Sequence, residues 1–234
     1  MGLAINEHSD GILLTEEVEN FLKMCVRKKL NILLSGMPDS AVMTVLQKLV
    51  SHIDHERVIF IQDEPKEAEI ESFNNPVSPY HKDDFLYIAA TESISKRKIA
   101  HTAMKLNASR IIFENITGDE AEVLLEIWAS GYIGSMAVIH EQKPYNALLK
   151  IASCFPGSVL KPSIDHLIKE AAYYVEVVIQ TEKLTNGSAV ISSISVFDYK
   201  DGKVNQRDLF VFDKERNALV NTGVILEKVN SLEE

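Results

Sequence analysis

Residues 30–50, LNILLSGMPDSAVMTVLQKLV, decide the fold of this chain. The run from Leu30 to Leu34 is short and almost wholly apolar, which is typical of a strand buried on both faces. A turn with glycine and proline follows it. Beyond the turn, apolar residues return at the three- and four-residue spacing of a helix, at Val42, Val45, Leu46, Leu49 and Val50. We therefore predict a strand, a loop and a helix in this order.

The same alternation recurs along the first two thirds of the chain. Apolar runs predict further strands at 58–61, 110–113 and 135–139, and helical spacing predicts helices at 15–28, 94–106, 121–129 and 144–152. Strands that alternate with helices form a mainly parallel sheet with right-handed crossovers, flanked by helices. The segment between Glu64 and Asp84 holds three prolines and is predicted to be a loop.

Beyond Pro162 the pattern changes. Residues 173–182 and 189–199 are rich in Val, Ile and Tyr, and the Asn186-Gly187 pair between them favours a hairpin turn. We therefore expect two parts. Residues 1–162 form the α/β core, and residues 163–234 form a helix and an antiparallel β appendage packed on that core.

Composition excludes several classes of protein. The 234 residues are 46% hydrophobic and 25% charged, as in globular chains and unlike disordered ones. The net charge of −10 argues against nucleic acid or an anionic membrane as the main partner. Cys25 and Cys154 are too far apart for a redox or zinc motif, so no metal is predicted. The chain shows neither a secretory signal nor an apolar run of about 18 residues, so we expect a cytoplasmic protein that is not membrane-embedded.

Short motifs occur here in a characteristic order: Phe21-Leu22 before Leu30 to Gly36, then Arg110-Ile111-Ile112, Gly134-Ser135-Met136 with Ile139-His140, and Asp208 to Asp213. In this order and spacing the chain resembles the ATPase domain of the type II and type IV secretion and pilus traffic ATPases, with the tight-adherence pilus motors as the closest branch. The resemblance covers most of residues 15–223 and leaves no room for the family's separate amino-terminal domain. It implies a RecA-like P-loop fold, ATP with magnesium, and a hexameric motor.

The phosphate-loop motif of that family is largely missing. The pattern G-x-x-x-x-G-K-[ST] needs two glycines for close backbone approach, a lysine for the phosphates and a hydroxyl for magnesium. Laid on the turn after the first core strand, these four positions fall on Gly36, Ala41, Val42 and Met43. In addition, Asp39 puts a carboxylate where a triphosphate would lie. We therefore do not expect ATP binding by the usual route.

The other nucleotide motifs are also altered. Where the resemblance places the Walker B glycine and glutamate, this chain has Glu114 and Asn115, and an amide cannot accept the proton of an attacking water. The family's acidic box falls on residues 62–66 and keeps Asp63, but Gln62 and Lys66 replace its two glutamates. Arg97 retains a basic position of the family, and His140 matches its histidine box.

These losses together predict a pseudo-ATPase: a non-catalytic structural or regulatory subunit that acts by protein contact, without a cofactor. The predicted partner is an active paralogous motor ATPase or an inner-membrane platform protein, and self-assembly stays open. The vestigial cleft would consist of Gly36, Ser40, Val42, Met43, Asp63, Arg97 and His140.

Two alternatives stay open. The first is an unorthodox ATPase that uses ATP and magnesium, with Glu114 or Glu67 as the base and Arg97 as the cation. The second is a small-molecule or nucleotide binding module that reuses the old cleft, with Ser35, Gly36, Ser40 and His140 around the ligand.

Ordinary structural roles are the simpler interpretation for some of these residues. Asp39 and Ser40 are expected to cap the following helix, and Asp63 to cap or turn the chain after its strand. His140 is expected to hydrogen-bond at a strand end. The run 27–29, Arg-Lys-Lys, is expected to complement the dipole at the end of its helix and not to form a binding patch.

Overall fold

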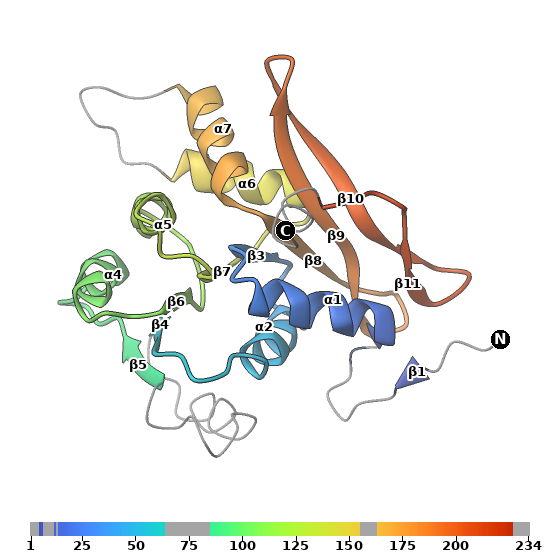
Figure 1. Cartoon of the computed structure of the whole chain (residues 1–234), viewed down its shortest axis with the longest axis horizontal. Coiled ribbons are helices and arrows are strands. Elements are labelled where there is room, and N and C mark those ends of the chain that lie inside the picture. Colours follow the sequence, from blue (N-terminus) through green and yellow to red (C-terminus); the bar gives the residue numbers. More distant parts are fainter. Residues whose placement is uncertain (1–4, 7–11, 13, 64–84, 155–162, 227–234) are drawn as a thin grey trace.

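The computed structural model describes residues 5–6, 12, 14–63, 85–154 and 163–226. In this part of the chain, a nine-stranded sheet runs through the molecule with helices on both faces (Figure 1). The predicted loop at 64–84, the residues Lys66 and Glu67, and the boundary predicted at 162 all lie outside the described residues.

The strand order of the sheet is β11-β10-β9-β8-β3-β7-β6-β4-β5. The strands are β3 (Ile32–Ser35), β4 (Val58–Gln62), β5 (Phe85–Ala89), β6 (Arg110–Phe113), β7 (Met136–Ile139), β8 (Val177–Lys183), β9 (Ala189–Lys200), β10 (Lys203–Asp213) and β11 (Ala218–Asn221). From β8 to β5 neighbouring strands are parallel, and from β8 to β11 they are antiparallel. The predicted mainly parallel sheet with antiparallel carboxy-terminal strands is thus confirmed.

The carboxy-terminal strands join the core in a way that the sequence did not indicate. β8 pairs in parallel with β3, at the register Ile32 to Val177. The antiparallel strands therefore extend the core sheet edge to edge. A short separate ladder, β1 (Ile5–Asn6) with β2 (Leu14–Thr15), precedes the first helix.

Helices cover both faces of the sheet. One face carries α1 (Glu16–Arg27) and α2 (Val42–Val50), and the other carries α4 (Lys96–Lys105), α5 (Glu120–Ala129), α6 (Pro144–Ser153) and α7 (Ile164–Tyr174). Successive side chains of a strand point to opposite faces, so Ile32 and Leu34 pack under α1 and α2, whereas Leu33 packs under the other helices. Both faces of β3 are therefore buried, as its apolar run predicts.

The start of β8 differs from the prediction, whereas the other predicted boundaries lie within two residues of those observed. Tyr173 and Tyr174 were expected to begin a strand, but they end α7, and β8 starts at Val177. The helix is anchored by Leu167, Ile168, Ala171 and Ala172, which are buried at helical spacing. Because tyrosine is also common in strands, the run of Tyr and Val concealed this boundary.

Two kinds of feature are absent from the residues that the structure describes. No helix among them is long and apolar enough to cross a membrane. Nor do three or more His, Cys, Asp or Glu side chains come together there in a group that could hold a metal ion.

Candidate functional site

The predicted site residues lie at the carboxyl ends of the parallel strands. Gly36 and Ser40 follow β3, Asp63 follows β4, Asn115 follows β6 and His140 follows β7. In open α/β sheets this edge is where ligands bind, because the loops that leave the strands form a crevice there. The contacts at this edge divide into two parts, the turn after β3 and the ends of β4 and β6.

The interior of the turn after β3 is filled by side chains of the protein itself. The hydroxyl oxygens of Ser40 and Thr181 lie 2.7 Å apart. The Ser40 hydroxyl lies 2.5 Å from the Met37 carbonyl oxygen. The Thr181 hydroxyl lies 3.3 Å from the Ser35 carbonyl oxygen. Gly36 has no side chain to compete for this space, since a Cβ placed on it would overlap both hydroxyl oxygens. β8, through Thr181, therefore closes the turn.

The first turn of α2 corrects the predicted helix cap. The residue before the helix is Ala41, in the left-handed conformation with φ of 59°, and no side chain caps it. Ser40 is engaged inside the turn, and Asp39 instead forms an ion pair of 3.2 Å with Lys183 at the surface. A left-handed alanine is strained by about 1–2 kcal/mol, so the contacts around it must hold this conformation.

Val42 is the residue that the family resemblance places at the position of the phosphate-binding lysine. Its side chain is 0% exposed and belongs to the apolar core under α1 and α2. Met43, which the same resemblance places at the magnesium-binding hydroxyl, is partly buried and packs against the same core. Neither side chain offers a charge or a hydrogen bond to an anion.

An ion cluster lies at the other part of the edge. The ammonium group of Lys96, at the start of α4, is 2.7 Å from Asp63 Oδ1 and 2.8 Å from Glu120 Oε1, and it donates to the Asn115 carbonyl at 2.9 Å. The Lys96 side chain is 10% exposed and that of Glu120 is 5% exposed. Neither Lys96 nor Glu120 was predicted from the sequence to be a site residue. The relevant signal would have been a lysine and a glutamate that each begin a helix at this edge.

Burial and charge oppose each other in this cluster. Burial acts to raise the pKa of Glu120, but the hydrogen bond from Lys96 and the amide of Thr117 outweigh it and hold that pKa below its usual value. Burial likewise acts to lower the pKa of Lys96, yet its hydrogen bonds to Asp63 and Glu120 raise it. Both groups are therefore charged at neutral pH.

Asn115 and Glu114, where the family resemblance places the Walker B motif, both contact Asp63 of this cluster. Asn115 donates its amide Nδ2 to Asp63 Oδ2 at 3.3 Å, while its Oδ1 is buried without a partner among the described residues. Glu114 accepts a hydrogen bond of 3.0 Å from the backbone amide of Asp63. Both side chains therefore fix the chain after β4.

Arg97 and His140 lie apart from each other. Arg97 forms an ion pair of 2.5 Å with Glu122 and donates to the Asp119 carbonyl, so it links α4 to α5. His140 Nδ1 lies 2.9 Å from the Gly36 carbonyl oxygen and ties the end of β7 to the turn. Of the predicted site residues, Asp63 therefore contacts Asn115, and His140 contacts Gly36. Arg97 instead contacts α5.

A cavity of about 480 Å³ adjoins the turn, between the ends of β7 and β8. Charges of both signs line it, among them Asp39, Glu141 and Lys143. Gln180, only 4% exposed, donates its Nε2 to the carbonyls of Glu141 and Thr181, and its Oε1 has no partner in the described part of the chain. Neither Gln180 nor Thr181 was predicted from the sequence to be a site residue.

Comparisons with known proteins give sequence relatives and structural neighbours. No family model matches the chain. A probable conjugal transfer protein TrbB of Sinorhizobium fredii is 22% identical over 195 residues, which is 82% of this chain and 55% of the relative. Protein VirB11 of Rhizobium radiobacter is 29% identical over 163 residues, which is 69% of this chain and 45% of the relative. The chain therefore spans about half the length of the curated relatives it matches.

A solved structure gives the same relationship at the level of the fold. The VirB11 ATPase of the Brucella suis type IV secretion system, crystallised with sulphate, superimposes with a TM-score of 0.65 at 19% identity, over 76% of this chain and 51% of that one. The predicted fold is thus confirmed, whereas a place in the tight-adherence branch stays a prediction. The chain is thus related in sequence to proteins VirB11 and TrbB, and it shares the fold of a VirB11 ATPase of a type IV secretion system.

Proposed function

We propose that this chain is a non-catalytic relative of the secretion motor ATPases and acts as a structural or regulatory subunit through protein contact. One observation carries the proposal: the turn that would hold phosphate is closed from within by Ser40 and Thr181. The position of the phosphate-binding lysine is Val42, which is buried in the core. A polyanion at this turn would find no counter-charge from Val42 and would have to displace the two hydroxyls.

The ion cluster supports the same proposal. Magnesium bound between Asp63 and Glu120 would have to displace the Lys96 ammonium, which those two carboxylates already neutralise. Asn115 cannot act as a general base, and Glu114 is engaged with the backbone after β4. The residues at this edge therefore do not fit ATP with magnesium, and we derive no hydrolytic step through them.

What the chain retains is the fold of the motor domain. Such a domain can dock beside an active paralogous ATPase, or on an inner-membrane platform protein, at a place that an ATPase domain would otherwise occupy. Its role would then be to complete or restrain a motor on the cytoplasmic side. Recovery of motor components with the tagged chain from native cells would support this role, and repeated recovery of none would count against it.

Hydrolysis of ATP is the direct test of the non-catalytic part of the proposal. Phosphate release is measured with the purified chain at millimolar ATP and magnesium, beside an active secretion ATPase and the variant Asp63→Ala. We expect the wild-type chain and the variant to give the same background rate. A wild-type rate near that of the active enzyme, lost in Asp63→Ala, would establish the unorthodox ATPase instead.

Gln180 favours a second candidate function, the binding of a small molecule in the cavity beside the turn. Its buried Oε1 lacks a donor, and an N–H or O–H group of a ligand could supply one. Nucleosides and nucleoside monophosphates at millimolar concentration should then raise the melting temperature of the wild-type chain, and less so that of Gln180→Met. Equal or absent shifts in both proteins would dismiss this candidate.

A further inference from the structure

Four basic side chains face one another on two helices far from the ion cluster. Lys23 and Arg27 are four residues apart on α1, which places them on one side of that helix. Lys48 on α2 and His52, just beyond its end, repeat the spacing. Glu19 of α1 joins the two helices, because its Oε1 lies 3.4 Å from the ammonium of Lys23 and 3.2 Å from that of Lys48.

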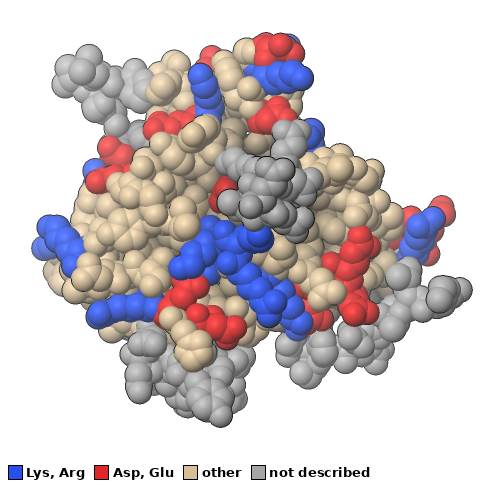
Figure 2. Space-filling view, in the orientation of Figure 1, with Lys and Arg blue, Asp and Glu red and all other residues tan. Residues whose placement is uncertain are grey.

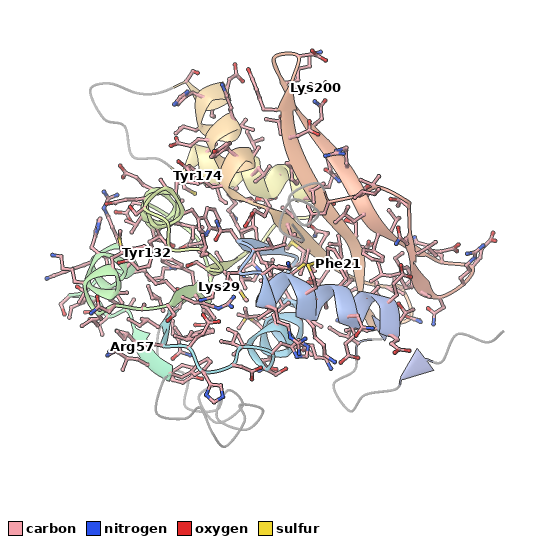
Figure 3. All side chains as sticks on the ribbon, in the orientation of Figure 1. Phe21, Lys29, Arg57, Tyr132, Tyr174 and Lys200 are labelled. Carbon is pink, nitrogen blue, oxygen red and sulfur yellow. The ribbon has the colours of Figure 1, made fainter. Side chains whose placement is uncertain are left out.

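This basic surface is visible on the molecule. Figure 2 shows lysine and arginine side chains gathered in the middle of one face, over the part that Figure 1 labels α1 and α2. Figure 3 places Lys29 at the carboxyl end of α1 and Phe21 near the middle of the same helix. We define the basic surface by the residues Lys23, Arg27, Lys28, Lys48 and His52.

Acidic side chains neutralise the basic surface only in part. Glu19 is shared between Lys23 and Lys48, while Glu56 pairs with Lys29 at its border. Arg27 is exposed, and among the described residues neither Arg27 nor Lys28 forms an ion pair. The surface therefore retains positive charge on a chain whose net charge is −10.

His52 lies inside this field. Its Nε2 is buried and has no hydrogen-bond partner among the described residues. Burial, and then the charges of Lys23, Lys48 and Arg27, lower the pKa of His52 to about 4, although Glu19 acts in the opposite direction. The imidazole is therefore neutral at pH 7, and the single charge of Glu19 balances only one of the three cations around it.

We infer that the basic surface docks an acidic segment of a partner protein. This inference differs from the expectation that residues 27–29 only complement the dipole at a helix end, which stays a prediction. An anionic membrane or a nucleic acid extends well past the basic surface and would also meet the acidic remainder of the chain, which repels it. At physiological salt the attraction of the basic surface is screened beyond about 8 Å, so it acts only on charges that lie close to it. A short acidic segment pairs with the surface alone. The inference extends the proposed role in protein contact, and it requires nothing of the nucleotide edge.

Phe21 and Met24 give the same helix an apolar border. Both are partly buried against the core, and Phe21 packs on Phe210 with ring centroids 5.2 Å apart. A partner helix with glutamates four residues apart could place them over Lys23 and Arg27 and rest its apolar side on this border. The expected partner segment is therefore both acidic and amphipathic.

The test uses a fluorescein-labelled helical peptide with leucines on one side and glutamates at four-residue spacing, and a counterpart with glutamine for every glutamate. Binding is followed by fluorescence anisotropy at low and physiological salt. We expect the glutamate peptide to bind the wild-type chain, and Lys23→Gln/Arg27→Gln to weaken its affinity about tenfold. The matched control is Lys98→Gln/Lys105→Gln, which removes two exposed lysines of α4 and should leave the affinity unchanged. Circular dichroism checks that each variant is folded.

Several results would overturn the inference. They are absent binding of the glutamate peptide, equal loss of affinity in the two double variants, and equal binding of the glutamine peptide. Tighter binding to phosphatidylglycerol vesicles or single-stranded DNA, dependent on Lys23 and Arg27, would assign the surface to another partner. Self-association lost in the same variant, seen by sedimentation, would assign it to a second copy. The readout is peptide binding and not ATP hydrolysis. The docking inference can therefore fail while the chain proves non-catalytic, and the non-catalytic role can fail while the peptide binds.

Discussion

The two parts of the carboxyl edge are closed by different kinds of contact. At the turn after β3, neutral hydroxyls of Ser40 and Thr181 fill the space that Gly36 leaves open. At the ends of β4 and β6, the charge of Lys96 lies between Asp63 and Glu120. The first closure depends on volume and the second on charge. Substitutions that change only volume or only charge should therefore separate the two.

The largest effect is expected from Lys96→Met. Removal of one partner of a buried ion cluster leaves Glu120 charged, buried and without its counter-ion, so the free energy of unfolding should fall by about 3 kcal/mol. Urea denaturation followed by circular dichroism measures this. The double variant Lys96→Met/Glu120→Gln should regain a large part of the loss, because its glutamine carries no charge. Similar stability of Lys96→Met and the wild type would show that the cluster does not close this end.

The second-largest effect is expected at the turn after β3. In Gly36→Ala the added Cβ meets Thr181 and Ser40 oxygens, and such overpacking should reduce the free energy of unfolding by about 2 kcal/mol. Gly118→Ala is the matched control and should have the smaller effect, since its Cβ would meet a single atom, a Glu120 oxygen at 3.3 Å. Chemical denaturation of the two variants in parallel measures their free energies of unfolding. Equal losses, or a smaller loss in Gly36→Ala, would show that the turn is loosely filled.

A fall in pH should distinguish the two closures, because the ion cluster contains carboxylates that titrate in acid and the hydroxyls at the turn do not. The folded-state pKa of Glu120 is lowered below its ordinary 4.5, so its contribution to stability is complete above that pH and is lost as the pH falls through the lowered value. We expect Glu120→Gln to flatten the decline of the melting temperature in this acidic range. Gly36→Ala should decline in parallel with the wild type. A parallel decline in Glu120→Gln would contradict the assignment.

The smallest effect is expected at Ala41, and it has the opposite sign. Glycine adopts the left-handed conformation without strain but costs entropy when the chain folds, so Ala41→Gly should stabilise the protein by only about 0.5 kcal/mol. The matched control is Ala121→Gly, which replaces a buried residue of helix α5 and should destabilise. Thermal denaturation shows whether each variant is more or less stable than the wild type. Destabilisation by Ala41→Gly would show that the alanine is not strained.

Periodicity predicted the fold well, because strands and helices are set by local spacing. The pattern of residues 30–50 was sufficient to predict β3 and α2, and its recurrence along the chain predicted the parallel sheet. The short strand β5, Phe85–Ala89, was not predicted; it is only partly buried and lacks a clear pattern. The boundary at Tyr173 was misplaced because tyrosine and valine favour strands, while the burial of one helix face decided the outcome.

The candidate site could be predicted only in outline. The sequence places Gly36, Asp63 and Asn115 at the same edge, but not the side chains that fill it. Ser40 was expected to cap α2, yet its hydroxyl bonds to Thr181, which is 141 residues further along the chain. Lys96 reaches Asp63 and the Asn115 carbonyl because β4 and β6 are neighbours in the sheet, and this order cannot be read from local pattern.

The central claim is that the turn after β3 cannot hold a nucleotide phosphate. Calorimetric titration of magnesium and ATP into the purified chain tests it most directly, with a homologous active ATPase titrated in the same buffer. We predict only the heat of dilution at millimolar nucleotide. Saturable heat that requires magnesium, and that disappears when Asp63 is replaced by alanine, would contradict the account.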